Sequence, residues 1–393
     1  MSNSKMPEII PANRVSHVKE YYFSKKLREV AMLNREGKDI ISLGIGGPDL
    51  PPSAEVIGEL CTSAAKSDVH SYQPYVGLQE LREAFARWYA KYYNVTLDPA
   101  TEIQPLIGSK EGILHISLAF LNPGDGVLVP NPGYPTYTSV SNLVEAEIFR
   151  YDLTEESGWL PDFDELEKLP LERIKLMWLN YPNMPTGAPA TMELFEKAVA
   201  FARKHNIVLV NDNPYSFILN DNPISLLGVP GAKDIAIEMN SLSKSHNMAG
   251  WRIGMLATNP TFVNYILKVK SNIDSGQFKP MMLAAVKALD SDSEWYKSLN
   301  KIYAERRRVA ELIMDKLECK FDRNQRGLFL WGKIPEDAES SEKFADRILY
   351  EARVFITPGF IFGSNGERFV RISLCATKEN LERALERVEK FIK

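Results

Sequence analysis

The sequence contains little cysteine, no long hydrophobic run and no large excess of either charge. Its three cysteines, Cys61, Cys319 and Cys375, are far apart in a chain of 393 residues and form no C-x-x-C pair. This spacing argues against a zinc site and against a disulfide framework. No window approaches the length of a membrane-spanning helix, and residues 1–10 have neither an apolar signal core nor an arginine-rich amphipathic pattern. We therefore expect no metal site and a cytoplasmic location.

The balance of charges argues against a nucleic-acid partner. The chain has 47 basic and 51 acidic side chains, a formal net charge of -4, which leaves no broad positive field for phosphate backbones. We interpret the run Arg306-Arg307-Arg308 as the solvated face of a helix. There is no internal repeat or low-complexity tract. The 45% hydrophobic content supports a sizeable core, and the length is enough for two domains.

Apolar runs alternate with helical patterns over much of the chain, and this alternation predicts the fold class. Such alternation is typical of a doubly wound α/β domain with a mostly parallel sheet. After about residue 285 the pattern changes to that of a smaller α+β domain. Strands are expected at 39–43, 126–129, 174–179, 207–210, 235–239, 327–331 and near Val354 and Val370, and helices at 14–36, 192–205, 294–317 and from Lys378.

The segment 241–254, Ser-Leu-Ser-Lys-Ser-His-Asn-Met-Ala-Gly-Trp-Arg-Ile-Gly, is the most informative part of the chain. It places Lys244 among small hydroxyl-bearing residues just after an apolar run. An exposed lysine has a pKa of ~10.4, so a site that uses its amine must lower that pKa by burial or by nearby positive charge. Arg252 could supply the charge. A lone lysine after a core strand is more often a surface residue. Whether Lys244 has a chemical role must therefore be judged from the residues expected near it.

A second segment, residues 206–215, ends a hydrophobic run in Asp212 and places Tyr215 three residues later. Open parallel sheets bind ligands at the carboxyl ends of their strands, so Asp212 and Lys244 are expected to face one crevice. A lysine that can form a Schiff base and an acid that can pair with a pyridinium nitrogen are what pyridoxal phosphate requires of its protein.

The Lys244 segment resembles the cofactor-lysine signature of class I and II aminotransferases, a group of fold-type-I pyridoxal-phosphate enzymes. Further matches follow in the family's order, from Leu-Gly-Ile-Gly-Gly-Pro-Asp at 43–49 to Phe-Val-Arg-Ile-Ser at 369–373. The resemblance implies that the N-terminal segment folds back onto the smaller domain. The expected division is a large cofactor-binding domain of residues 46–285 and a discontinuous small domain of residues 1–45 and 286–393.

The cofactor phosphate is expected at the start of a helix, where backbone donors and a positive field meet. The sequence Ile-Gly-Ser-Lys-Glu-Gly opens an apolar-periodic helix and is similar to the family's phosphate-cradling turn. The resemblance implies that Gly108, Ser109 and Lys110 bind the phosphate. Ser241 and Arg252 are expected as further donors, with Arg252 forming a charge-assisted fork.

Two tyrosines are implied as cofactor contacts by the same resemblance. Tyr134, in the turn Asn-Pro-Gly-Tyr-Pro, matches the aromatic residue that stacks on one face of the pyridine ring. Tyr215 matches the residue whose hydroxyl reaches the phenolic oxygen and tunes the pKa of the imine. A tyrosine in a proline-rich turn is also common without any ligand.

The segment 180–187, Asn-Tyr-Pro-Asn-Met-Pro-Thr-Gly, departs from the family's pattern. The family usually has an asparagine immediately before Pro-Thr-Gly, and that asparagine donates to the phenolic oxygen. Met184 occupies the position here, and a thioether cannot donate a hydrogen bond. Asn183 is expected to substitute after a small backbone shift, with Asn180, or Tyr215 alone, as the alternatives.

Substrate binding and subunit contacts are implied by three further matches. Arg371 matches the family's α-carboxylate arginine, and a guanidinium binds a planar carboxylate through two parallel bonds. The backbone of Gly46, in a turn that lets the main chain approach a ligand closely, is expected to assist. Tyr72 matches a tyrosine that reaches the phosphate of the neighbouring subunit, which implies a homodimer. The ordinary alternatives are an exposed strand arginine and a packed core tyrosine.

The implied reaction moves an amino group from an L-amino acid to a 2-oxo acid. Lys244 would hold pyridoxal phosphate as an imine and, once freed, act as the base at Cα, while Asp212 keeps the ring nitrogen protonated. Another fold-type-I activity, such as that of a carbon-sulfur β-lyase or an aminocyclopropane carboxylate synthase, uses the same residues and stays as the alternative. Neutral, aromatic, acidic and diaminopimelate-type amino donors all remain open.

Three other classes of protein fit the sequence less well. Ser241-x-x-Lys244 also fits penicillin-interactive enzymes, but their Ser-Asp-Asn and Lys-Thr-Gly partners are absent from the sequence. Gly44-x-Gly46 suggests a nicotinamide site, but Asp49 stands where G-x-G-x-x-G requires glycine. Transcription regulators with this fold carry a DNA-binding domain, and the residues before the glycine-rich turn are too few for one.

Overall fold

The core of the fold is a seven-stranded sheet with the order β2-β8-β7-β6-β5-β3-β4. The computed structural model describes residues 9–16 and 22–392. Neighbouring strands are parallel except at β8, which runs antiparallel to both β2 and β7. The strands are β2 (Ile103–Leu106), β3 (Gly126–Asn131), β4 (Glu147–Asp152), β5 (Ile174–Leu179), β6 (Val208–Asp212), β7 (Ala236–Ser241) and β8 (Gly254–Ala257). The mostly parallel α/β sheet expected from the alternating pattern is confirmed.

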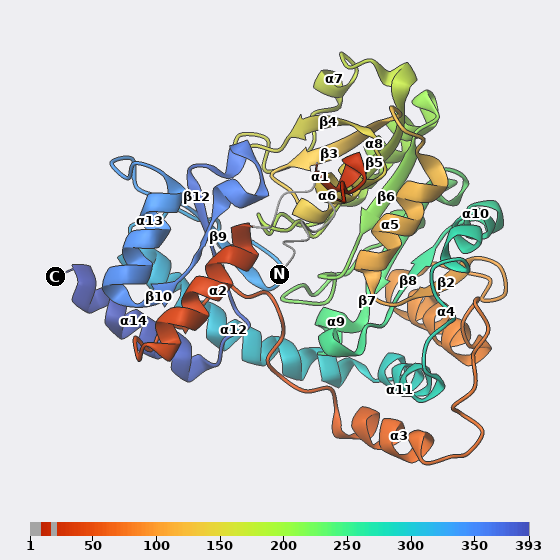
Figure 1. Cartoon of the computed structure of the whole chain (residues 1–393), viewed down its shortest axis with the longest axis horizontal. Helices are drawn as coiled ribbons and strands as arrows, with labels where there is room; N and C mark the ends of the chain where they lie inside the picture. The colour runs from red at the N-terminus through yellow and green to blue at the C-terminus, as the bar shows by residue number, and fades with distance from the viewer. Residues whose placement is uncertain (1–8, 17–21, 393) are drawn as a thin grey trace, which may run out of the picture.

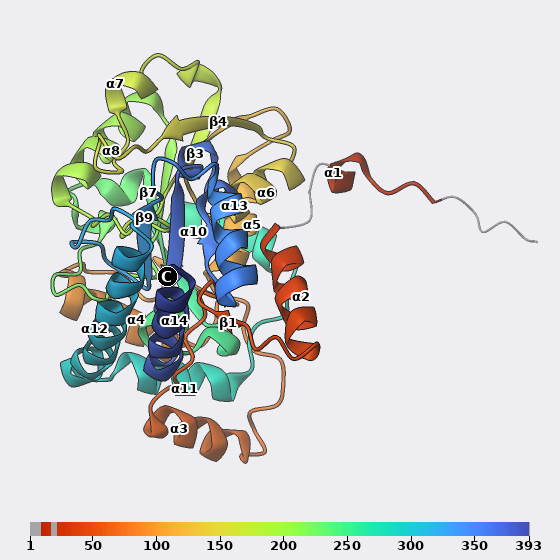
Figure 2. The same ribbon diagram turned by 90° about the vertical axis from the view of Figure 1, so that its left-hand side faces the viewer.

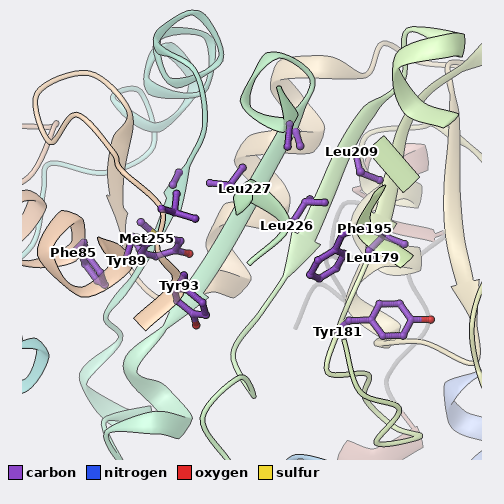
Figure 3. Close-up of a cluster of buried hydrophobic side chains, with 14 of the residues drawn as sticks. Phe85, Tyr89, Tyr93, Leu179, Tyr181, Phe195, Leu209, Leu226, Leu227 and Met255 are labelled. Atoms are coloured by element: carbon purple, nitrogen blue, oxygen red, sulfur yellow. The ribbon is translucent and has the colours of Figure 1, made fainter. Parts of the chain in front are cut away.

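Helices cover both faces of this sheet (Figure 1), which explains why its central strands are apolar at nearly every position. Along β3, Val127 and Val129 pack with α5, α6 and α10, whereas Leu128 packs with α4, α8 and α11 on the other face. Figure 3 shows part of the hydrophobic cluster on the Leu128 face of the sheet. The helices of this region are α3 (Ala54–Ala64), α4 (Gln79–Tyr93), α5 (Ser109–Phe120), α6 (Pro135–Leu143), α7 (Phe163–Leu166), α8 (Met192–His205), α9 (Leu242–Ser245), α10 (Pro260–Lys270) and α11 (Lys279–Leu289).

A second hydrophobic core gathers residues from both ends of the chain. Ile41 and Leu43 pack there with side chains drawn from residues 299–388. Its antiparallel sheet has the order β11-β12-β9, and β1 pairs in parallel with β10. Figure 2 shows α12 and α14 side by side beside these strands. The elements are α1 (Asn13–Ser16), α2 (Tyr22–Arg35), β1 (Ile41–Ser42), α12 (Ser293–Lys316), β9 (Phe329–Lys333), α13 (Ser341–Arg347), β10 (Val354–Phe355), β11 (Thr357–Pro358), β12 (Phe369–Ser373) and α14 (Lys378–Ile392).

Several boundaries differ from those expected from the sequence. The helix predicted at 14–36 is seen as α1 and α2, and residues 17–21 lie outside the described part. The strand predicted at 327–331 is β9, which begins two residues later, at Phe329. Among residues 9–16 and 22–392, no helix combines the length and the apolar character that crossing a bilayer requires.

Arg306 corrects the interpretation of the arginine run as a solvated face. Its side chain is buried and donates to both carboxylate oxygens of Asp49, at 2.6 and 2.8 Å, and to the carbonyl of Leu374 at 3.1 Å. A fork of this kind is charge-assisted and directional. Arg306 therefore ties α12 to the glycine-rich turn after β1, because Asp49 follows that turn.

Candidate active site

A cavity of about 770 Å³ opens at the carboxyl edge of the large sheet. The neighbouring strands β3 and β5 lead in opposite directions, since the chain goes from β3 to β4 on one side and from β5 to β6 on the other. A switch of this kind is where open α/β sheets bind ligands. Ten of the residues singled out in the sequence line the cavity: Gly46, Ser109, Lys110, Tyr134, Asp212, Tyr215, Ser241, Lys244, Arg252 and Arg371.

Lys244 lies in the short helix α9, whose first turn is capped by the hydroxyl of Ser241 at the end of β7. The Ser241 hydroxyl accepts from the Ser243 N–H at 3.2 Å. The Lys244 amine donates to the carbonyl of Gly46 at 2.5 Å. Burial, and then the positive charges of Arg371 and Arg252, lower the pKa of the Lys244 amine. A lowered pKa makes the neutral, nucleophilic form of the amine more accessible near neutral pH.

Asp212 ends β6 and presents one carboxylate oxygen without a protein partner. Its Oδ2 accepts from the hydroxyl of Tyr137 at 3.0 Å, whereas Oδ1 is buried and has no hydrogen-bond partner among the described residues. Burial raises the pKa of this carboxyl to about 6, and Tyr137 and Lys244 oppose the rise. A buried acceptor without a partner is costly, so Oδ1 fits a donor that a ligand brings, such as a protonated ring nitrogen.

The turn before α5 fits a phosphate group. Gly108 has a φ of +77° and is the N-cap of α5, so Ser109 and Lys110 form the first turn of a helix, whose N-terminus favours an anion. The guanidinium of Arg252 lies against this turn, because a Cβ at position 108 would be 2.2 Å from Arg252 Nη2. The positive φ favours glycine at 108, and the end of the Arg252 side chain occupies the space next to it.

Arg371, on β12, lies between two aromatic rings at the wall opposite the sheet. Its guanidinium carbon is 3.9 Å from the ring centre of Phe329 and 4.7 Å from that of Phe362. One nitrogen, Nη2, donates to the carbonyl of Gly44 at 3.0 Å, and Nη1 donates to the sulfur of Met184 at 3.3 Å. Burial lowers the pKa of Arg371 to about 10. No carboxylate of the described residues pairs with this cation, so it can accept one from a substrate.

Asn183, the residue expected to replace the missing asparagine, makes its hydrogen bonds within its own turn. Its side-chain amide donates to the Asn180 carbonyl at 3.2 Å, and its oxygen accepts from the backbone and hydroxyl of Thr186 at 3.3 and 2.7 Å. These bonds close its own turn, and the residue does not line the cavity. Asn180, the alternative considered from the sequence, does line the cavity and donates to the Asp212 carbonyl at 2.5 Å.

Two further predicted residues, Gly108 and Tyr72, lie outside the cavity lining. Gly108 is just behind Ser109, in contact with Arg252 as described. Tyr72 is 89% exposed and is not part of the cavity in the single chain.

The sequence did not predict that Tyr137 and Arg150 belong to the site, nor that Met184 contacts Arg371. Tyr137 stacks on Trp178 with ring centres 5.1 Å apart, and this places its hydroxyl on Asp212. Nothing in the spacing identifies it, since an internal tyrosine of α6 has an ordinary core role. Arg150, on the edge strand β4, lines the cavity and has no acidic partner among the described residues; pattern alone cannot distinguish it from a surface arginine.

The cavity therefore matches a phosphorylated pyridine cofactor held by a reactive lysine, as in the pyridoxal-phosphate enzymes. Residues 38–388 match the family model for aminotransferase class I and II, and the chain belongs to this family.

Similarity to individual proteins extends over nearly the whole chain. It is 42% identical over 390 residues to the LL-diaminopimelate aminotransferase of Maridesulfovibrio salexigens, covering 98% of this chain and 100% of that protein. It is 40% identical over 380 residues to the LL-diaminopimelate aminotransferase of Aquifex aeolicus, covering 96% and 98%. The substrate-bound BacF structure from Bacillus subtilis has a TM-score of 0.93 and 37% identity, covering 98% of both chains. The probable N-succinyldiaminopimelate aminotransferase of Thermus thermophilus has a TM-score of 0.84 and 33% identity, covering 93% and 99%.

The chain is thus a pyridoxal-phosphate-dependent aminotransferase, which moves an amino group between an amino acid and a 2-oxo acid. This confirms the class of enzyme and the cofactor expected from the sequence. The relatives support aminotransfer and not the lyase or synthase alternative.

Asp212→Asn is expected to stabilise the cofactor-free protein more as the pH rises. The folded-state pKa of about 6 lies above the ordinary value of 3.8, so the fold favours the protonated carboxyl. The protonated Asp212 carboxyl therefore stabilises the wild-type fold fully below pH ~4. This contribution, about 3 kcal/mol in total, is lost as the pH rises through about 6. Urea unfolding of both proteins from pH 4 to 8 measures the difference, with the exposed Asp221→Asn as the control. A difference that does not change with pH would contradict the unpaired burial of Asp212.

Proposed function

We propose that Lys244 binds the cofactor covalently and carries the proton that leaves and returns at the substrate Cα. The observation that supports this role is the pairing, in one cavity, of a buried amine of lowered pKa with a buried carboxylate oxygen that has no partner. Bound pyridoxal phosphate supplies an electron sink for the charge that develops at Cα. Asp212 would hold the proton on the ring nitrogen, and the Gly46 carbonyl would orient the Lys244 amine.

Separate groups of residues would hold the phosphate and the ring. Gly108, Ser109, Lys110, Ser241 and Arg252 are proposed for the phosphate, since they converge at the start of α5 and the end of β7. Tyr134, the N-cap of α6, would pack against the ring. Tyr215 would donate to the phenolic oxygen.

Arg371 and the backbone of Gly46 are proposed for the α-carboxylate of the substrate. The aromatic faces of Phe329 and Phe362 hold the guanidinium in place without neutralising it. The domain division at residues 45/46 and 285/286 is proposed as well. It is supported by the packing of Ile41 and Leu43 with side chains of residues 299–388, whereas the core that contains Leu128 draws on residues 56–296. Arg371 would then approach the cofactor from the smaller domain.

The substrate is proposed to carry a second anionic group, as LL-diaminopimelate and 2-oxoglutarate do. The curated relatives quoted above are named for LL-diaminopimelate. The described residues that line the cavity include five basic side chains and one acidic one, Asp212. The phosphate, the α-carboxylate and the reacting amine account for four of the basic groups, so Arg150 is proposed for the second anionic group.

A homodimer in the cytoplasm is proposed as the working form. Exposed apolar side chains, namely Tyr72, Tyr75, Tyr265, Ile273 and Phe278, occur in the segments 72–76 and 261–278. Tyr75 and Tyr265 also line a hollow of about 750 Å³, whose lining comes from residues 74–76 and 261–271 of these segments. Apolar surface of this kind favours burial against another protein surface, and a second copy would also bring Tyr72 to the neighbouring phosphate.

Lys244→Ala is expected to abolish the visible absorbance of the lysine-bound cofactor and to lower transamination by about 10³-fold or more, because the proton carrier is lost. Absorbance spectra of the purified protein and a coupled assay measure the two effects. Lys197→Ala, at an exposed position of α8 that lines neither the cavity nor the hollow, is the control and should leave both unchanged. An unaltered spectrum in Lys244→Ala would disprove the assignment.

Arg150→Met is expected to raise the KM for 2-oxoglutarate about tenfold, the equivalent of one hydrogen bond to a charged group. The KM for pyruvate should stay within about twofold, because pyruvate has no second carboxylate to lose a contact. Steady-state assays with a panel of amino donors, LL-diaminopimelate included, measure both constants. Arg173→Met is the matched control. Arg173 is an exposed arginine that pairs with Glu147, a residue of the same strand as Arg150. An equal rise for both acceptors would argue against the proposed subsite.

Mixing Tyr72→Ala with Lys244→Ala subunits is expected to restore activity. A hybrid dimer would contain one site with both defects and one with neither, provided that Tyr72 completes the neighbouring site. Assays after joint refolding measure the recovery. Asp212→Asn mixed with Lys244→Ala is the control and should give none, because both residues belong to the same chain's cavity. No recovery in the first mixture would rule out the shared site.

A further inference from the structure

A buried ionic cluster lies directly behind the turn proposed for the phosphate. Glu111 and His115, both on α5, meet Lys270 at the end of α10 and Asp274 in the segment that follows. His115 Nε2 is 2.7 Å from Glu111 Oε1, and the Lys270 amine is 3.3 Å from the same oxygen and 2.5 Å from Asp274 Oδ2. The side chains of these four residues are at most 18% exposed. None of the roles assigned above uses this cluster.

The cluster is complete without a metal ion. Glu111, His115 and Asp274 bring ligand-type atoms within 4.8 Å of one another, but the Lys270 amine already contacts both carboxylates. A second cation there would meet the charge of Lys270 at close range. The contacts therefore indicate a structural role.

Glu111 connects the cluster to the phosphate turn. Its second oxygen, Oε2, accepts from the backbone N–H of Ile107 at 3.1 Å. Ile107 precedes Gly108, whose positive φ gives it wide conformational freedom. Glu111 is the third residue of α5, so its carboxylate reaches back over the helix start as in a capping box. The bond fixes the direction in which the chain enters the turn.

Lys270 and Asp274 connect the same cluster to Arg252. Asp274 Oδ1 accepts from the Gly276 N–H at 2.8 Å, and Gln277 next to it donates through its side chain to the Arg252 carbonyl at 2.8 Å. The segment after α10 therefore supports the backbone of Arg252, while Glu111 supports the turn that Arg252 touches. One ionic cluster joins the two elements.

We propose that Glu111 and Lys270 are positioning residues that hold the 107–110 turn and Arg252 in the geometry that binds the cofactor phosphate. This inference rests on the phosphate role proposed for that turn and for Arg252. Neither residue touches the cofactor, so both act through the backbone they hold. Removing Lys270 leaves the carboxylates of Glu111 and Asp274 without the cation between them, and removing Glu111 leaves the Ile107 N–H without its acceptor. Either change loosens the turn.

The test compares two probes, pyridoxal phosphate and pyridoxal, the same molecule without its phosphate. Their dissociation constants are measured by absorbance titration of cofactor-free wild type, Glu111→Ala, Glu111→Gln and Lys270→Met. Glu111→Ala and Lys270→Met are expected to weaken pyridoxal phosphate binding about tenfold, with pyridoxal binding within about twofold of wild type. Glu111→Gln retains an acceptor for the Ile107 N–H and is expected to recover part of the loss.

Glu102→Ala is the matched control, because Glu102 pairs with Lys233 at 2.7 Å in a half-buried ion pair and does not line the cavity. It should leave the ratio of the two constants unchanged. An unchanged ratio in Glu111→Ala and Lys270→Met would overturn the positioning role, even if both probes bound more weakly. A wild type that binds the two probes equally would instead overturn the phosphate role of the turn itself.

Discussion

The close approach of β8 to the turn before α5 is the constraint on which the site depends. Gly254, the first residue of β8, pairs with Leu106 on one side and with Ser241 on the other. A Cβ there would lie 2.8 Å from the backbone nitrogen of Ser109, so only glycine fits. Because β8 runs antiparallel to its neighbours, its beginning meets the ends of β2 and β7. Arg252, two residues earlier, is thereby delivered to the same edge as Lys244.

The cavity contains charges that the protein alone leaves incompletely paired. Burial moves the pKa of Asp212 up and the pKa of Lys244 and Arg371 down, so each group is held away from the state it favours in water. Folding such groups without a ligand costs stability, and sites for chemistry commonly show this conflict. Within residues 9–16 and 22–392, Asp212 Oδ1 has no hydrogen-bond partner and Arg371 has no carboxylate partner, and a ring nitrogen and a substrate carboxylate would supply them.

The sheet could be predicted from sequence because parallel strands covered on both faces are continuous apolar runs, as 174–179 shows. The site residues at the strand ends could be predicted because open parallel sheets bind ligands at the carboxyl ends of their strands, and because these residues match the family's motifs. Arg306 was mispredicted because a run of arginines does not reveal which of them faces the protein. The bond between Asn183 and Thr186 could not be predicted, because it depends on the folded turn. Tyr137 and Arg150 owe their positions to contacts between distant elements, which spacing does not encode.

The wall of the cavity opposite the sheet is built partly by the beginning of α2, where Tyr22, Phe23 and Ser24 lie, and by residues 360–363. The apolar stripe of α2 packs on Leu349 and Phe355, away from the sheet. The groups that would hold the cofactor are thus mainly at the ends of the strands of the large sheet. The side chains that shape the space beyond it are largely on α2 and in residues 360–363. Substitutions at the beginning of α2 could therefore change which substrates fit the cavity while the residues proposed to hold the cofactor stay unchanged.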